Sequence, residues 1–412
     1  MTPDPRLDND ALLDAVQRAC FSYFWDHGHP TSYLSRDRST RDVCAIGGTG
    51  MGLMCIIAAC ARGFVSRGQA VARLTAMIDF LAGAERHHGV WGHFIDGATG
   101  RIAPFSKLDD GADLVETALL AVGLICARQF CDGSTAAETH LRSVANRLWH
   151  EIDWRAHRRP GEDSLFWHWS PRHGFAMNHR ITGWNECLIV YLLACASPTH
   201  AVPRSAYHKG WTAGGPFRNG KSYYGLDLPL GPDYGGPLFF AHYSFLGLDP
   251  RGLIDRYADY WRQNRQHALI NRAYCEANPK SFKGYGADCW GLTASDTIDG
   301  YTAHAPDNDR GVISPTAALA SMPYVPELSL RALRHFLIHY PQAWGEWGFR
   351  DAFSPQFDWV AEATLAIDQG PIAIMIENHR SALLWKLFMS APEVQRGLAR
   401  LGFDSPWLTP EV

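Results

Sequence analysis

Apolar residues recur at helical spacing along most of this 412-residue chain. Apolar positions three and four residues apart alternate with polar ones, and few segments show the period of two that a strand would give. This pattern predicts an all-α protein. The expected helices cover residues 10–25, 48–62, 68–86, 111–130, 136–150, 181–196, 236–246, 252–275, 313–322, 327–340 and 370–390.

Long connections rich in Trp, Tyr, Gly, Asp and His separate several of these helices. They cover residues 91–109, 154–180, 203–235, 278–312 and 341–369. Loops of this length in a compact domain are usually functional. No low-complexity linker divides the chain. We therefore expect one domain over residues 1–412. About a dozen helices with long loops fit an α/α toroid whose loops form a cleft at one end, although periodicity alone supports only the all-α class.

Three carboxylates open the apolar run over residues 111–130. At about 100° per residue, Asp109, Asp113 and Glu116 fall on one helical stripe, which continues into Leu120 and Leu124. A solvated face would continue with charged residues, so these acids point toward the core. Buried carboxylates cost free energy unless a function uses them.

Two interpretations of these acids remain open. In the structural one, Asp109 or Asp110 caps the helix and Glu116 pairs with a basic residue. In the functional one, the helix dipole keeps the carboxylates ionised, as a general base or a hydroxyl-binding group requires.

A fourth acid, Glu186, lies between Trp184 and a strongly apolar run. Loss of hydration there would raise its pKa, as a general acid requires. Two carboxyl groups in unlike environments are the acid and base expected for glycoside hydrolysis. The structural alternative is a first-turn glutamate that the helix dipole favours.

Aromatic residues interleaved with polar ones occur in five loop clusters, which begin near Trp91, Phe166, Tyr223, Tyr285 and Trp344. Aromatic faces stack on sugar rings, and neighbouring polar side chains bind hydroxyl groups. The clusters therefore favour a carbohydrate cleft. The candidates for substrate contact are Trp167, His168, Trp184, Asn185, Tyr285, Asp288, Trp290, Asp296, Trp347, Arg350, Asp351 and Glu377.

The composition of the chain limits the kinds of partner that it can bind. The 42 acidic and 38 basic residues leave a net charge of -4 without a basic tract, which argues against nucleic acid and anionic membranes as partners. No apolar run is long enough to cross a bilayer, and the first residues lack a signal-peptide pattern. The ten cysteines lie mostly among apolar neighbours, as buried free thiols do. We expect a cytoplasmic protein, or a periplasmic one if a signal peptide has been removed.

Metal and phosphate sites are not indicated. His335 and His339 have helical spacing but no glutamate between them, and His87, His88 and His93 follow no known ligand pattern. The glycine-rich run at 47–52 lacks the Lys-Ser/Thr of a P-loop, so close helix packing explains it better. We expect neither a metal nor a cofactor.

Long runs of the chain resemble the glycoamylase-like domain of glycoside hydrolase family 144. The similarity extends over roughly residues 15–402. It is carried by ADLVETALL (112–120), LFWHWSP (165–171), MNHRITGWNE (177–186), GGPLFFAHYSFLGLDP (235–250), DCWGLTASD (288–296) and IDQGPIAIMIENHR (367–380).

This resemblance implies an (α/α)6 toroid that hydrolyses β-1,2-glucans, either internally or from an end with release of sophorose. It also implies inversion without a metal. The matching acids are Asp109, Asp113, Glu116 and Glu186. In this hypothesis Glu186 is the general acid, Asp113 is the base, directly or through a water or substrate hydroxyl, and Asp109 and Glu116 hold hydroxyls.

Two other functions remain open. A sugar epimerase or isomerase on the same toroid would use histidines, with His168, His179, His242 and His304 available in the loops. A binding protein would hold glucan without turnover. Endo or exo action, chain-length preference and oligomeric state are not specified by the sequence.

Overall fold

The computed structural model describes residues 2–213 and 217–408, which are mostly helical. The helices are α1 (Asn9–Trp25), α2 (Ile46–Ala61), α3 (Arg67–Gly83), α4 (Leu114–Phe130), α5 (Ala136–Glu151), α6 (Leu188–Ala196), α7 (Tyr260–Ala277), α8 (Pro315–Leu319), α9 (Pro326–His339), α10 (Ala366–Ser381), α11 (Leu383–Met389) and α12 (Pro392–Leu401).

Short antiparallel strands occur in the connections. They are β1 (Val43–Ala45), β2 (Phe94–Asp96), β3 (Ile102–Ala103), β4 (Ala112–Asp113), β5 (His168–Trp169), β6 (Arg218–Tyr223), β7 (Leu226–Leu230), β8 (Ala294–Thr297), β9 (Gly300–Ala303), β10 (Trp344–Gly345), β11 (Gly348–Phe349), β12 (Phe353–Ser354) and β13 (Trp359–Val360). Strands β1, β2 and β3 form one sheet; the others pair as β4 with β5, β6 with β7, β8 with β9, β10 with β11 and β12 with β13.

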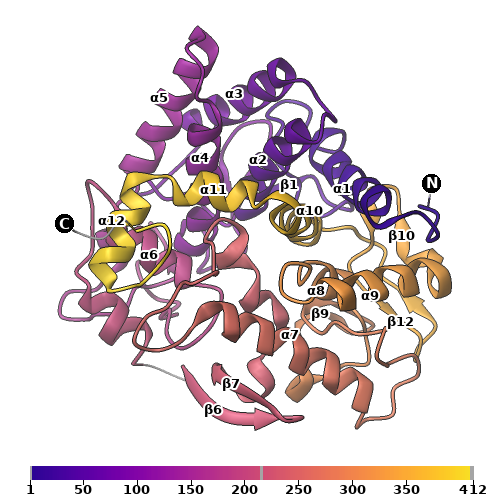
Figure 1. The fold of residues 1–412 in the computed structure, drawn as a ribbon. Helices are drawn as coiled ribbons and strands as arrows, with labels where there is room; N and C mark the ends of the chain where they lie inside the picture. The colour runs from indigo at the N-terminus through magenta and orange to yellow at the C-terminus, as the bar shows by residue number, and fades with distance from the viewer. Residues whose placement is uncertain (1, 214–216, 409–412) are drawn as a thin grey trace.

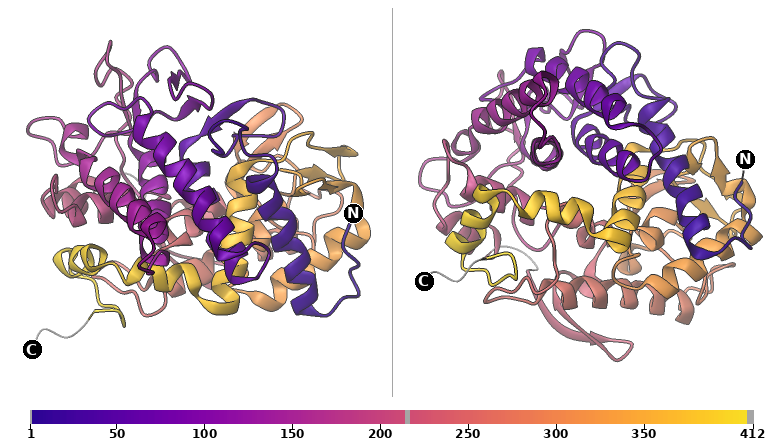
Figure 2. Two further views of the ribbon diagram at one scale, coloured as in Figure 1. Left: turned by 90° about the horizontal axis from the view of Figure 1, so that it is seen from above. Right: turned by 45° about the horizontal axis from the view of Figure 1, so that its top comes forward.

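Burial divides the helices into inner and outer ones. In α2, 14 of 16 residues are buried, and in α6 all nine are, whereas α5 buries six of 16. A helix that is apolar all round belongs inside, and an amphipathic one covers it. Accordingly α2 packs against α4 and α10, while α3 and α5 lie outside α2 and α4 (Figure 1, Figure 2). Most of the buried apolar residues form one continuous cluster, with members from Leu12 to Phe403.

Glycines let α2 and α4 approach closely. A Cβ atom at Gly50 would lie 2.4 Å from the carbonyl oxygen of Leu119, and one at Gly123 would lie 2.4 Å from the carbonyl oxygen of Gly50. Real Cβ atoms do not occur at such distances, so both positions require glycine. This confirms that the glycine-rich run serves helix packing.

Several predicted helices have different bounds. The helices expected from residues 111 and 181 begin at Leu114 and Leu188, so Asp113 and Glu186 precede them. Residues 236–246 form two 3-10 turns, Leu238–Ala241 and Tyr243–Leu246, because Gly235 and Gly236 take positive φ angles just before them. The C-terminal helix α12 was missed.

The helix predicted over 370–390 is two helices. Ala382 has a φ of 59°, which ends α10 and starts α11. The side chain of Asn378 stabilises this break, since its oxygen accepts the Trp385 N–H at 3.2 Å and its amide donates to the Leu246 carbonyl at 2.9 Å. A side-chain bond of this kind has no signature in apolar periodicity.

All ten cysteines are free, and all but Cys60 are buried, as predicted. Within the described ranges, we find no helix that combines the length and the apolarity needed to cross a bilayer.

The close packing of α2 and α4 can be tested with Gly123→Ala. The added methyl group would push α2 and α4 apart, and overpacking of this kind lowers the free energy of unfolding by about 1–3 kcal/mol. Gly68→Ala on α3 is the matched control, because nothing lies within 4 Å of its Cβ position. It should stabilise the protein by up to about 1 kcal/mol. Urea unfolding measures the free energy of unfolding of both variants. Equal changes in Gly123→Ala and Gly68→Ala would contradict the close packing of α2 and α4.

Candidate active site

Two short strands and the start of α4 bring predicted site residues together. Strand β4 pairs with β5 so that Asp113 lies opposite His168. Asp113 is the N-cap of α4, since its Oδ1 accepts the N–H groups of Val115 and Glu116 at 3.0 Å each. The helix is therefore capped by Asp113, and not by Asp109 or Asp110.

The other oxygen of Asp113 faces aromatic donors. Its Oδ2 accepts from His93 Nδ1 at 3.0 Å and from Trp167 Nε1 at 3.2 Å, and the side chain is 0% exposed. Burial opposes its ionisation, but the hydrogen bond and charge of His93, together with the charge of His168, keep the pKa of Asp113 below its ordinary value. Asp113 is thus an enclosed carboxylate.

Asp109 completes this group from the loop before β4. Its Oδ2 lies 3.3 Å from His168 Nδ1, and its side chain is 4% exposed. Trp167 stacks on His179 with 4.8 Å between ring centroids, which fixes the indole that contacts Asp113. The expected meeting of Asp109, Asp113, Trp167 and His168 is therefore observed.

Glu116 lies in the first turn of α4 and reaches the N-terminus of α2. Its Oε2 accepts the Gly47 N–H at 2.6 Å. The partner is thus a backbone group that helix α2 leaves free, rather than the predicted basic side chain. Burial raises the pKa of Glu116 to about 7; the charge of His93 opposes this and that of Asp113 adds to it.

His93 lies among these acids. Burial alone would lower its pKa, but Glu116, Asp113 and Asp109 raise the pKa of His93 to about 10. Its backbone carbonyl accepts the N–H of Ile46 at 3.2 Å, which ties the residue to the start of α2. A positive imidazolium therefore partly balances the carboxylates.

Glu186 is a buried acid outside α4 whose pKa is also raised. It lies just before α6, is 8% exposed, and burial raises its pKa to about 7, with further increases from the charges of Glu116 and Asp113. The Ser244 hydroxyl donates to the backbone carbonyl of Glu186. The Asn185 side-chain oxygen accepts the Cys187 N–H at 3.0 Å. Rigid backbone thus holds a carboxyl group that is largely neutral below about pH 7.

A cavity of about 550 Å³ opens beside this cluster. His93 and Glu116 line it together with Asp37, Arg38, Arg41, Ala45, Phe94, Phe105, Leu119, Tyr243, Asp296, Gly300, Tyr301, Leu365 and Ile367. Arg38 Nη1 lies 3.3 Å from both carboxylate oxygens of Asp296. A cavity lined by both charged groups and aromatic rings suits a sugar, which offers both hydroxyls and C–H faces.

Pro371 in α10 helps to build this wall. Proline has no N–H to donate to the carbonyl of Ile367, and the Tyr243 hydroxyl donates to that carbonyl at 3.2 Å instead. The aromatic ring is thereby held at the cavity.

Asp351 lies behind the cavity. It is 0% exposed, and its Oδ2 accepts the backbone N–H of Asp296 at 2.7 Å. Burial, and the neighbouring charge of Asp296, raise the pKa of Asp351 to about 7. Its position makes it a support for Asp296 rather than a contact for a ligand.

Comparison with known proteins agrees with this arrangement. The profile of the Glycoamylase family, described as "Putative glucoamylase", matches residues 178–392. The chain belongs to this family. The resemblance to glycoside hydrolase family 144 is thereby confirmed.

Three proteins similar to this chain have names that state an activity. An exo β-1,2-glucooligosaccharide sophorohydrolase (non-reducing end) of Parabacteroides distasonis is 41% identical over 96% of the chain, which spans 58% of that relative's length. The structure of an endo-β-1,2-glucanase from Chitinophaga pinensis, in complex with sophorotriose and glucose, is 48% identical with a TM-score of 0.95, over 98% of this chain and 100% of that one. The structure of a β-1,2-glucanase from Parabacteroides distasonis is 40% identical with a TM-score of 0.94, and the match covers 96% of this chain and 60% of that one.

Several residues of this chain that were predicted to contact the substrate lie in the core. Trp184 and Trp290 are 2% and 0% exposed, which leaves no ring face for a sugar. Glu377 is 0% exposed and binds Arg62 through two bonds of 2.7 Å. The prediction that these three residues contact the substrate is wrong. Trp184 and Trp290 are buried in the core, and Glu377 is buried against Arg62.

Four further predicted contacts, Tyr285, Asp288, Trp347 and Arg350, have partners within the protein. The Tyr285 hydroxyl donates to Asp309 at 2.8 Å, and Asp288 pairs with Arg331 at 2.6 Å. Of the predicted site residues, Glu116 and Asp296 line the 550 Å³ cavity. Tyr285, Asp288, Trp347 and Arg350 do not, and the acids Asp109, Asp113 and Glu186 lie outside its lining as well. The rings of Trp347 and His27 are tilted against each other with 4.3 Å between centroids, and Arg350 donates to the Ala361 carbonyl at 3.3 Å.

The four histidines proposed for an epimerase lie in different places. His168 and His179 lie beside Trp167, with 5.8 Å between their ring centroids. His242 and His304 are buried, and burial lowers the pKa of each to about 3. They bind Ser321 and Ser295 at 3.0 Å. His242 and His304 are therefore core histidines.

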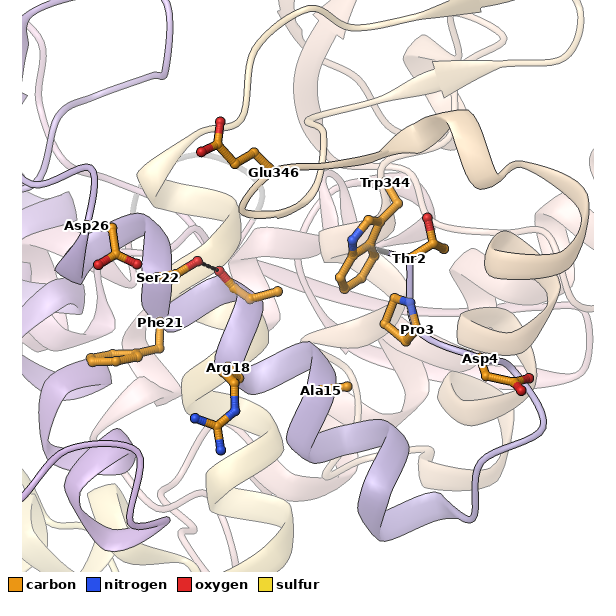
Figure 3. Close-up of a pocket in the computed structure, with 11 residues that line it drawn as sticks. Thr2, Pro3, Asp4, Ala15, Arg18, Phe21, Ser22, Asp26, Trp344 and Glu346 are labelled. Carbon is orange, nitrogen blue, oxygen red and sulfur yellow. Dashed lines mark hydrogen bonds between the residues drawn. The ribbon is translucent and has the colours of Figure 1, made fainter.

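A second cavity, of about 640 Å³, lies between the N-terminal segment, α1 and the loop of Trp344 and Glu346 (Figure 3). Its carboxylates are Asp4, Asp26 and Glu346, and the view shows them well separated around the opening. No member of the acid cluster lines it, so we place the chemistry elsewhere.

Some site residues were missed from the sequence. Asp37, Arg38, Tyr243 and Tyr301 line the cavity, and His93 joins the acids. His93 stands within an aromatic cluster that was noted, but Asp37 and Arg38 lie in a polar stretch that has no periodicity. Only the fold brings them to the acids.

The raised pKa of Glu186 predicts how stability changes with pH. Between its ordinary pKa of 4.5 and about 7 the folded state binds more protons than the unfolded state, so this group makes stability fall as the pH rises. The Glu186→Gln variant lacks the effect. Its melting temperature should therefore rise relative to the wild type as the pH increases through that window, as calorimetry can measure. A constant difference would contradict the raised pKa.

Proposed function

We propose that this chain is a glycoside hydrolase that cleaves β-1,2-glucosidic linkages in β-1,2-glucans or their oligosaccharides. The observation that carries the proposal is the contrast between Glu186, kept neutral by burial, and Asp113, kept ionised by His93. Hydrolysis of a glycoside needs one carboxyl group of each kind. The relatives' names supply the linkage.

In this mechanism Glu186 is the general acid. Its proton moves to the glycosidic oxygen as the bond to the anomeric carbon breaks, which leaves Glu186 ionised. A pKa of about 7 keeps the donor protonated under mildly acidic conditions. Trp167, His168 and the cavity wall formed by Arg38, Asp296 and Tyr301 hold the sugar.

Asp113 supplies the negative charge of the general base. Its oxygens are enclosed, so the attacking water does not reach them directly. We propose that a water or a substrate hydroxyl relays the proton to the Asp109 and Asp113 pair, while the water oxygen bonds to the anomeric carbon from the opposite face. The product is then inverted. Asp109 and Glu116 also bind hydroxyls.

We further propose that residues 1–412 form a single catalytic domain with the architecture of an (α/α)6 toroid. Inner helices α2, α4, α6 and α10 with amphipathic α3 and α5 outside support this arrangement. The loops rich in aromatic residues would then lie at the end where the acids gather.

The function is tested by incubating the protein with β-1,2-glucooligosaccharides of graded length, and with maltooligosaccharides because the family's description is glucoamylase. We expect cleavage of the β-1,2-linked series, with the α-anomer released first in NMR spectra. Sophorose as the sole early product would indicate cleavage from a chain end. Early products of mixed length would indicate internal cleavage. Cleavage of maltooligosaccharides alone would refute the proposal, and the β-anomer would refute inversion.

The Glu186→Gln variant tests the general acid. Loss of the proton donor should lower kcat on β-1,2-glucooligosaccharides by at least about 100-fold. On an aryl β-sophoroside, whose leaving group needs no proton, the loss should be much smaller. If Glu116→Gln gives this pattern and Glu186→Gln does not, the acid is Glu116, whose pKa is also about 7.

The Asp113→Asn variant tests the base. It keeps the shape of the N-cap but removes the charge, so kcat should fall by at least about 100-fold with both substrates. Asp110→Asn is the matched control, because Asp110 turns away to pair with Arg172 at 2.6 Å. If the two variants hydrolyse the substrates at comparable rates, Asp113 does not act as the general base.

A further inference from the structure

We propose that His93, Asp109, Asp113 and His168 form a binding site for a Zn²⁺ ion, and that the ion inhibits hydrolysis when it binds there. This goes beyond the proposed function, which uses the same carboxylates without a metal. The inhibition rests on that function, but the binding of the ion does not.

Three of the four proposed ligand atoms are already grouped. One atom each from His93, Asp109 and Asp113 lie within 4.8 Å of one another, and His93 Nδ1 is 3.0 Å from Asp113 Oδ2. Zn–N and Zn–O bonds of about 2.0–2.2 Å place tetrahedral ligands roughly 3.3–3.6 Å apart. Only small shifts would bring these atoms onto one ion.

His168 provides an independent indication. Its side chain is only 9% exposed, and its Nδ1 is buried without a hydrogen-bond partner among the described residues. That atom lies 3.3 Å from Asp109 Oδ2 and 3.7 Å from Asp113 Oδ2. A buried ring nitrogen that faces two carboxylates without hydrogen-bonding either is oriented as a metal ligand would be.

The donor set selects the kind of ion. Two imidazole nitrogens and two carboxylate oxygens suit Zn²⁺, whereas Ca²⁺ and Mg²⁺ prefer oxygen ligands alone. Trp167 Nε1 donates to Asp113 Oδ2 at 3.2 Å, and two backbone N–H groups hold Oδ1, so this ligand is already oriented. The ion would replace the proton between His93 and Asp113, and that proton would pass to solvent.

Occupation of the site would stop hydrolysis by neutralising the base. Asp109 and Asp113 would direct their oxygens at the ion, and the relayed proton would have no acceptor. Adding a chelator would restore activity, because no covalent bond of the protein has changed.

Titration of the metal-free full-length chain with Co²⁺ tests the site without any substrate, since four-coordinate Co²⁺ absorbs visible light far more strongly than aqueous Co²⁺. We expect one strongly absorbing Co²⁺ per chain, displaced by Zn²⁺. In His168→Gln the affinity should fall at least about tenfold. If this variant does not fold by circular dichroism, His93→Gln takes its place with the same expectation.

The surface pair His335 and His339, whose rings lie 4.5 Å apart on α9, is the matched control. The His335→Gln, His339→Gln double variant should bind Co²⁺ like the wild type and keep its hydrolytic rate. Absence of the absorption band, or its loss in this double variant but not in His168→Gln, would overturn the proposal. Binding of Co²⁺ by a chain without hydrolytic activity would refute the proposed function alone.

Discussion

The close approach of α2 and α4 is the constraint on which the site depends. Gly50 and Gly123 bring the two backbones into contact, and the N-termini of both helices then lie side by side. Asp113 caps α4, and Glu116, one turn later, reaches the free N–H of Gly47 at the start of α2. A wider separation would leave Glu116 without this partner.

The same packing sets the electrostatics of the site. Two helix N-termini and the imidazolium of His93 stabilise negative charge, so Asp113 remains ionised although it is 0% exposed. Glu186 lies before α6 with no cationic partner among its described contacts, and burial keeps it neutral to about pH 7. Position in the fold, rather than residue type, thus separates a neutral carboxyl group from an ionised carboxylate.

Local patterns predicted much of this site. Asp109, Asp113 and Glu116 lie within eight residues, and the apolar run after Glu186 was visible in the sequence. The starts of α4 and α6 were predicted too early. For α4 the reason is capping by Asp113, which depends on hydrogen bonds that periodicity does not record. Most of the helices themselves were found, since burial imposes their period.

Contacts between distant residues could not be predicted. His93, Arg38 and Tyr301 reach the site only through the fold. Conversely, Glu377 resembled a site acid in its motif, but Arg62, 315 residues away in sequence, neutralises it. A short motif shows which residues are present, but not which of them are already paired.

The most direct test of this account is the protonation state of the two acids. Carbon-13 NMR of selectively labelled side chains, assigned with Glu186→Gln and Asp113→Asn, follows each carboxyl group through a pH titration. The account predicts that Glu186 titrates near pH 7 and Asp113 below its ordinary pKa of 3.8. Titration of Glu186 near its ordinary 4.5, or of Asp113 above 3.8, would contradict it.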